Sequence, residues 1–238
     1  MTEPQDLNIQ HKTPPKSKNP SKKKYRPRAH VSPITYFDMH TSRLENIQFL
    51  DIGCGYGAFL LHLARKYPEK EVLGIEIRDK VKEYVQLTIN NSDLKNASVV
   101  KSNCMLFLPE IIEKGSIEKL FILYPDPMFK KKDRKYRIIC FQMIFVYKYI
   151  LNKCGKIYVS TDVVEYFDEM VDILQKDSSF EQKLIIKYEY LDNEWKLKHK
   201  EGEFDDISDA FVLGTDEARR AGLKNQTANG AIFERRMI

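Results

Sequence analysis

A glycine-rich turn after a short apolar run is the part of the sequence best suited to binding a small molecule. The run Phe49–Ile52 leads directly into Gly53-Cys54-Gly55-Tyr56-Gly57. Glycines permit a tight turn and let a ligand approach the backbone closely at the carboxyl end of a strand. We therefore expect Gly53 and Gly55 to contact a nucleotide-like cofactor.

The identity of that cofactor depends on nearby side chains, because the glycine spacing also fits a dinucleotide-binding dehydrogenase. Asp51 favours S-adenosylmethionine, since a carboxylate there would repel a pyrophosphate but could support a cationic amino-acid group. Glu76 ends the second predicted strand, where a carboxylate can accept hydrogen bonds from both ribose hydroxyls in either class. Ser102-Asn103-Cys104 follow the third predicted strand and could place polar groups near an adenine edge.

An aspartate between two prolines is the strongest candidate for a catalytic residue. Asp126 lies in Tyr124-Pro125-Asp126-Pro127, directly after the fourth predicted strand. We therefore expect it at the same edge of the sheet as the glycine turn. The prolines fix the backbone and remove two amide donors, an arrangement suited to presenting one side chain into a cleft.

A run of cations follows the candidate catalytic residue. Six of the eight residues from 130 to 137 are basic. Such a run is often only a solvated surface, but beside a candidate active site it predicts contacts with nucleic-acid phosphates. The predicted contacts are Lys130, Lys131, Lys132, Arg134, Lys135 and Arg137.

The first thirty residues carry the excess positive charge of the protein. They contain eight Lys and Arg against two acidic residues, whereas the formal net charge of the whole chain is +5. Their Pro, Lys, Ser and Asn content cannot bury enough apolar surface to offset ordering entropy, which predicts a flexible basic arm over residues 1–30. The arm could be a solubilising tail, a nuclear localisation signal or a phosphate-binding segment with Lys22, Lys23, Lys24, Arg26 and Arg28.

Short apolar runs alternate with helical patterns after residue 40, which is typical of an α/β fold with a mostly parallel sheet and helices on both faces. We assign residues 31–238 to this domain. Strands are predicted at Gln48–Ile52, Val72–Glu76, Ser98–Lys101, Leu120–Tyr124, Lys156–Thr161, Leu184–Leu191 and Ala231–Arg235. Helices are predicted at Ala58–Lys66, Lys80–Asn90, Leu106–Glu113, Arg137–Leu151 and Val164–Gln175.

Several classes of protein do not fit this sequence. Its four cysteines lie far apart and its five histidines lack metal-ligand spacing, so we expect reduced thiols and no metal. There is no signal-like apolar segment at the start, and no apolar run approaches the ~20 residues of a membrane span. We expect a soluble intracellular protein.

Taken together, these motifs resemble the tRNA (guanine-N7)-methyltransferases, in particular the eukaryotic branch. The resemblance rests on the glycine turn, Gly74-Ile75-Glu76-Ile77-Arg78, the Pro-Asp-Pro segment, the basic run, Tyr25-Arg26-Pro27-Arg28-Ala29-His30 and Gly214-Thr215-Asp216-Glu217. It implies a Rossmann-like class I S-adenosylmethionine-dependent methyltransferase. It also implies methylation of the variable-loop guanosine of tRNA, with a WD-repeat propeller as partner. From the basic arm we expect a location in the nucleus, with the cytoplasm as the alternative.

The resemblance also implies roles for single residues. Asp126 matches the catalytic aspartate, and Thr215 with Glu217 matches a late cofactor or guanine contact. Met128 stands where the family commonly has His, and Cys104 replaces a small Ala. The positions that match cofactor contacts are Gly53, Glu76, Ile77, Asn103, Cys104 and Leu123.

The chemistry implied by the resemblance needs few catalytic groups. Guanine N7 carries an in-plane lone pair and loses no proton before it attacks a sulfonium methyl, so positioning supplies most of the acceleration. Alternatives remain open: a methyltransferase for exocyclic amines, a non-catalytic scaffold that binds RNA or a partner, and a nicotinamide dehydrogenase. Trp195, Tyr188 and Tyr190 could stack on RNA, although packing against the protein is the simpler interpretation.

Overall fold

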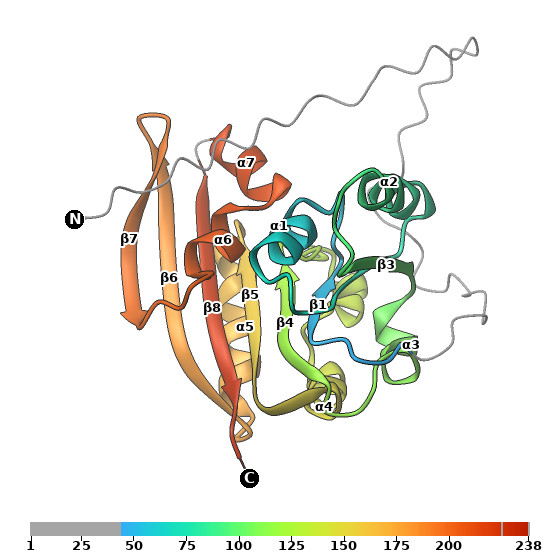
Figure 1. The fold of residues 1–238 in the computed structure, drawn as a ribbon. Coiled ribbons are helices and arrows are strands. Elements are labelled where there is room, and N and C mark those ends of the chain that lie inside the picture. The colour runs from blue at the N-terminus through green and yellow to red at the C-terminus, as the bar shows by residue number, and fades with distance from the viewer. Residues whose placement is uncertain (1–43, 225, 238) are drawn as a thin grey trace.

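The computed structural model describes residues 44–224 and 226–237, which build one eight-stranded sheet in the order β3-β2-β1-β4-β5-β8-β6-β7 (Figure 1). The pairs among β1 to β5 are parallel, and β8 and β7 each run antiparallel to their neighbours. The strands are β1 Phe49–Ile52, β2 Val72–Glu76, β3 Ala97–Lys101, β4 Ile117–Leu123, β5 Leu151–Thr161, β6 Phe180–Leu191, β7 Glu194–Gly202 and β8 Thr227–Arg235.

Helices cover both faces of the sheet and create two separate apolar layers. Buried residues of α1, α2 and α6 form one core cluster, and those of α3, α4 and α5 form the other. Every residue of β1 and β2 is buried, as expected for central parallel strands of a sheet with two covered faces. The helices are α1 Ala58–Lys66, α2 Asp79–Asn90, α3 Cys104–Ile111, α4 Phe141–Ile150, α5 Val164–Lys176, α6 Ser208–Leu213 and α7 Asp216–Gly222, with a 3-10 helix η1 at Lys131–Tyr136.

The order of the strands places the two main sequence motifs together. The chain after β1 crosses to β2 on one side, whereas β4 pairs with β1 on the other. This reversal of strand order leaves a crevice at the carboxyl ends of β1 and β4, the usual ligand site of an open α/β sheet. The glycine turn leaves β1 at this edge, and the Pro-Asp-Pro segment leaves β4 at the same edge.

The predicted mostly parallel α/β architecture is confirmed, and most predicted elements lie within a few residues of the observed ones. The predicted helix Arg137–Leu151 is wrong at both ends: α4 spans Phe141–Ile150, and Leu151 pairs with Ile117 as the start of β5. The backbone of Arg137 is extended, with φ −65° and ψ 132°. The basic residues before it form η1.

Three elements at the C-terminal side were not predicted. β7 lacks an alternating apolar pattern because nearly all of its side chains are exposed. α6 and α7 span only 6 and 7 residues, which is too short for a clear helical period. The predicted basic arm, with Lys22, Lys23, Lys24, Arg26 and Arg28, lies outside the described residues.

The aromatic residues of the β6–β7 hairpin support α7. The rings of Tyr190 and Trp195 lie 5.2 Å apart in an edge-to-face arrangement. Gly222 of α7 packs on them so closely that an added Cβ would meet the Tyr190 ring at 3.1 Å. These rings therefore pack within the protein, and they hold the helix that carries Glu217.

Candidate active site

The glycine turn adopts a backbone that L side chains rarely accept. Gly53, Gly55 and Gly57 have φ values of 75°, 53° and 80°, in the left-handed region that glycine tolerates without a steric penalty. The amide of Gly53 donates to the carbonyl of Ile75 at 2.7 Å. An added Cβ on Gly57 would lie 2.9 Å from Val85, so this turn also needs glycine for close packing against α2.

A cavity of about 440 Å³ opens at this edge of the sheet. Gly53 and Gly55 border it on one side, and Asp126 borders it on another. The two loops thus face one cleft, as the sequence predicts. Of the other predicted cofactor contacts, Glu76, Ile77, Asn103, Cys104, Leu123 and Glu217 line the same cavity.

Glu76 is buried at the end of β2 and is held in place by Arg78. One carboxylate oxygen accepts hydrogen bonds from the backbone amide and Nε of Arg78, at 2.9 and 3.0 Å. The other accepts from Nη2 at 2.9 Å. The pairing with Glu76 raises the pKa of Arg78. Glu76 therefore presents a fixed, charged acceptor to the cleft, as a ribose diol requires.

The loop after β3 offers a further polar group. The Ser102 hydroxyl is buried on the cleft and has no hydrogen-bond partner among the described residues, although buried polar atoms are nearly always paired. Asn103 is partly engaged in structure, because its side-chain oxygen accepts from the Met105 amide and caps α3. Burial raises the pKa of the Cys104 thiol, which leaves it an uncharged packing group.

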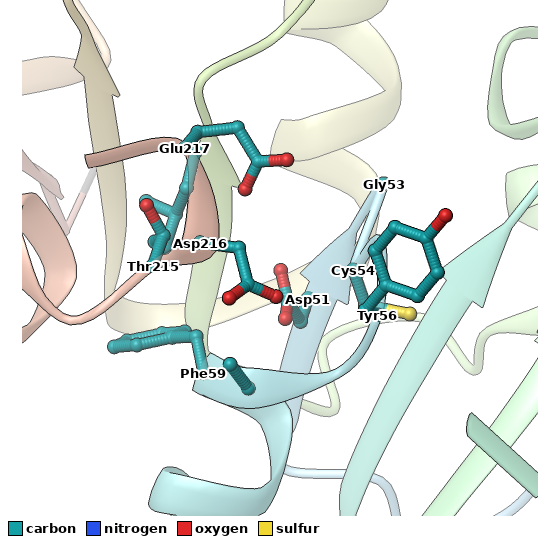
Figure 2. Close-up of a pocket in the computed structure, with 10 residues that line it drawn as sticks. Asp51, Gly53, Cys54, Tyr56, Phe59, Thr215, Asp216 and Glu217 are labelled. Carbon is teal, nitrogen blue, oxygen red and sulfur yellow. The ribbon is translucent and has the colours of Figure 1, made fainter. Parts of the chain in front are cut away.

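A second, smaller pocket adjoins the first and is strongly acidic. Figure 2 shows the carboxylates of Asp51, Asp216 and Glu217 turned toward the same space between α7 and the glycine turn. Thr215 also borders this pocket, and its hydroxyl accepts from the Ala218 amide as the cap of α7. Gly53 and Glu217 line both pockets, so they are continuous parts of one site.

Burial and neighbouring acidic groups raise the pKa values of two carboxyl groups in this pocket. Burial, with the neighbouring charges of Glu217 and Glu76, raises the pKa of Asp51 to about 8. Burial also raises the pKa of Glu217. A cationic ligand in this pocket would relieve the repulsion, which fits the positively charged methionine end of S-adenosylmethionine.

The loop that carries Asp126 is strained and anchored at several points. Tyr124 and Met128, which flank the Pro-Asp-Pro segment, have φ values of 50° and 45°. Non-glycine residues in this region cost of order 1 kcal/mol or more and occur most often at functional sites. The Tyr124 hydroxyl donates to the Val212 carbonyl at 2.7 Å, which ties the loop to α6.

Arg137 departs from its predicted role as a phosphate contact. The residue is only 5% exposed, and its Nε donates to the Pro127 carbonyl at 2.7 Å. Its guanidinium pairs with Glu169 of α5 and lies 4.6 Å from the centre of the Tyr166 ring. Because these contacts satisfy its charge inside the protein, Arg137 positions the loop from within instead of facing a ligand.

The remaining cations of the run do face solvent. They continue from the Asp126 loop into η1, and Tyr136 at the end of η1 lines the cavity. A positively charged surface that could bind phosphates therefore lies beside the cleft. The exposed cations are Lys130, Lys131, Lys132, Arg134 and Lys135.

Sequence reasoning gave no site role to three residues that line the cavity, namely Arg78, Tyr136 and Arg220. Ser102, which the sequence suggested for the adenine edge, also lines it and supplies the unpaired hydroxyl. The Glu76–Arg78 spacing could have suggested a pair, but the position of Arg220 depends on α7, which has no clear sequence pattern. Arg220 forms an ion pair with Glu217 at 3.2 Å.

Within residues 44–224 and 226–237, no group of three or more His, Cys, Asp or Glu side chains has the arrangement of a metal site. No helix in that part of the chain could span a membrane. All four cysteines are free thiols.

The chain is similar to methyltransferases in both sequence and fold. A family model described as "Putative methyltransferase" matches residues 45–204. The fold is similar to a SAM dependent methyltransferase from Aquifex aeolicus, with a TM-score of 0.51, 14% identity, and coverage of 82% of this chain and 84% of that chain. The protein is a Rossmann-like methyltransferase, and its cofactor is S-adenosylmethionine.

Closer relatives define the family. The chain is 32% identical over 240 residues to a tRNA (guanine-N(7)-)-methyltransferase of Culex quinquefasciatus, covering 92% of this chain and 95% of the relative. It is 30% identical to the enzyme of that name from Arabidopsis thaliana, covering 91% and 92%. The chain belongs to the tRNA (guanine-N7)-methyltransferase family.

The raised pKa of Asp51 predicts that the free energy of unfolding of the cofactor-free protein depends on pH. The folded state keeps the proton up to about pH 8, whereas the unfolded chain releases it near pH 4. The free energy of unfolding therefore falls as pH rises between these values, by up to about 1.4 kcal/mol per pH unit from Asp51 alone. Asp51→Asn should flatten this decline in urea unfolding of the cofactor-free protein from pH 5 to 8. Parallel curves for the two proteins would contradict the assignment.

Proposed function

We propose that this protein transfers a methyl group from S-adenosylmethionine to N7 of the variable-loop guanosine of tRNA. The observation that carries the proposal is the single cleft bordered by the glycine turn and by Asp126. The names of the relatives support tRNA and guanine N7 as the target. The variable loop is the position implied by the resemblance in sequence.

The cofactor would occupy the two connected pockets. S-adenosylmethionine supplies an electrophilic methyl group on a sulfonium centre. Glu76, held by Arg78, accepts from the ribose hydroxyls, and Ser102 donates or accepts at the adenosine end. Asp51 and Glu217 face the cationic amino-acid end, which favours their charged forms when the ligand is bound.

Asp126 would orient the guanine and not remove a proton from it. Its carboxylate accepts hydrogen bonds from guanine N1–H and the exocyclic amine, which turns N7 toward the methyl group. Its negative charge favours the purine cation that develops during transfer. The prolines and the Arg137 contact to Pro127 hold the carboxylate at a fixed place, so that positioning supplies the rate acceleration.

Methylation of tRNA followed by chemical cleavage tests this proposal. Borohydride and aniline treatment should cut the product at one variable-loop guanosine, because only N7-methylated guanosine gives strand scission. Asp126→Ala should lower kcat by ~100-fold or more, in the range of losing one preorganised transition-state contact. Calorimetric affinity for S-adenosylmethionine should change less than about threefold.

Two outcomes favour the alternatives. Methylated tRNA that resists cleavage would indicate an exocyclic-amine methyltransferase. A pure protein that binds no S-adenosylmethionine, alone or with its partner, would indicate a non-catalytic scaffold.

The exposed cations beside the cleft would neutralise tRNA phosphates, together with the basic residues of the arm. Each neutralised phosphate contributes roughly 0.7 to 0.9 to the slope of log affinity against log salt. Replacing Lys130, Lys131 and Lys132 by Gln should therefore reduce the slope by up to about 2 to 3. Arg137→Gln should not change the slope, since that charge is buried. A slope unaffected by the triple substitution would contradict this surface.

The basic arm also supports a location in the nucleus. Lys22-Lys23-Lys24 followed by Arg26 and Arg28 has the composition of a nuclear localisation signal. Imaging of the chain fused to a fluorescent protein should show nuclear signal that is lost on deletion of residues 1–30.

A WD-repeat propeller partner, implied by the resemblance in sequence, would need an apolar docking face. α4 has one: Phe141, Phe145 and Tyr149 recur every four residues and are 56%, 67% and 37% exposed. Aromatic residues are enriched at protein interfaces, and an exposed row of them favours a protein partner.

Disruption of this row tests the docking face. Phe145→Glu should weaken binding of the propeller subunit by at least about tenfold, as expected for a buried aromatic contact. Leu87→Glu, an equally disruptive change at an exposed apolar residue of α2, should have no effect. Unchanged affinity of the Phe145 variant would place the partner elsewhere.

A further inference from the structure

The ring of Phe129 is exposed directly beside the cleft. It is 71% accessible, although a large aromatic side chain usually gains from burial. The preceding residue, Met128, lines the cavity together with Asp126. The exposed ring thus stands one residue beyond the wall of the candidate active site.

The backbone under this ring is fixed and strained. Met128 has a φ of 45°, and the Pro127 carbonyl accepts from the buried Arg137. Strain of this kind persists only where the surroundings hold it, and it is concentrated at functional sites. The loop therefore presents Phe129 on a firm support.

The charges next to Phe129 indicate what the ring contacts. Lys130, Lys131 and Lys132 follow it directly and are exposed. An exposed aromatic ring beside a row of cations is the arrangement that proteins use to stack on nucleobases while binding phosphates. An uncharged lipid surface or an apolar protein surface would not need this density of positive charge.

The target adds a geometric requirement. A guanosine within folded tRNA must leave its stack to reach Asp126. The neighbouring bases then lose their stacking contacts with it. Apolar side chains inserted between bases compensate for such losses in other nucleic-acid complexes. A ring one residue from the cleft wall is placed to fill the vacated space.

We propose that Phe129 stacks on the nucleobase next to the target guanosine and takes the place of the displaced guanine. The inference rests on tRNA being the substrate, as proposed above. It makes Phe129 a substrate-binding residue that favours the displaced conformation, distinct from Asp126, which holds the guanine itself.

Single-turnover methylation provides the first test. Phe129→Ala should slow N7 methylation of folded tRNA by about 5- to 150-fold, the range found when a base-stacking aromatic is replaced by alanine. Phe129→Trp should stay within about threefold of the wild-type rate, because indole also stacks. Leu87→Ala, at an exposed apolar residue away from the cleft, is the matched control and should be unchanged. Thermal unfolding and cofactor affinity should be the same in all four proteins.

Fluorescence supplies a readout that does not depend on activity. The wild-type chain has one tryptophan, Trp195, so its emission gives the background for Phe129→Trp. Adding tRNA should quench the additional indole in the Phe129→Trp protein, as base stacking does.

Wild-type rates for Phe129→Ala, equal losses in the Ala and Trp variants, or an unquenched indole would each overturn the inference. Failure of the wild-type protein to methylate N7 would instead count against the proposed function.

Discussion

The site depends on the parallel pairing of β1 and β4 at the point where the strand order reverses. Parallel neighbours end at the same edge of a sheet, so the loops that follow them must share the space beyond it. The place of the cleft follows from this pairing. The glycine turn forms one wall, the Pro-Asp-Pro loop forms another, and residues from β2, the segment after β3 and α7 complete the enclosure.

The cofactor pocket illustrates a conflict between stability and binding. The carboxylates of Asp51 and Glu76 are buried, Glu217 borders the same site with its side chain 40% exposed, and the neighbouring charges that act on Asp51 are themselves carboxylates. Arg78 offsets the charge of Glu76, and Arg220 that of Glu217. Unliganded, the cluster is costly at neutral pH, and this cost selects for a ligand that carries positive charge.

Sequence patterns predicted those parts of the molecule whose periodicity or motifs are local. α1 and β2 have the predicted bounds, since α1 buries one apolar face and β2 is a continuous buried run, apolar up to Glu76. The shared cleft was also predictable, since it follows from strand order. The inward orientation of Arg137 was not, because Glu169 and Tyr166, which hold its guanidinium, lie about 30 residues away on α5. In sequence it is one more cation in a basic run. β7 and α7 were missed because exposed strands and helices of about two turns carry no clear apolar period, yet they position Glu217.

The most direct test of the central claim is a crystal structure with S-adenosylhomocysteine and 7-methylguanosine bound together. The thioether sulfur should face the N7 methyl group at about 3 to 4 Å, close to the reacting separation of a near-attack arrangement. Asp126 should contact guanine N1 and the exocyclic amine, and Glu76 should contact the ribose of the cofactor product. A structure in which the two ligands occupy separate clefts, or in which Asp126 touches neither, would contradict the account.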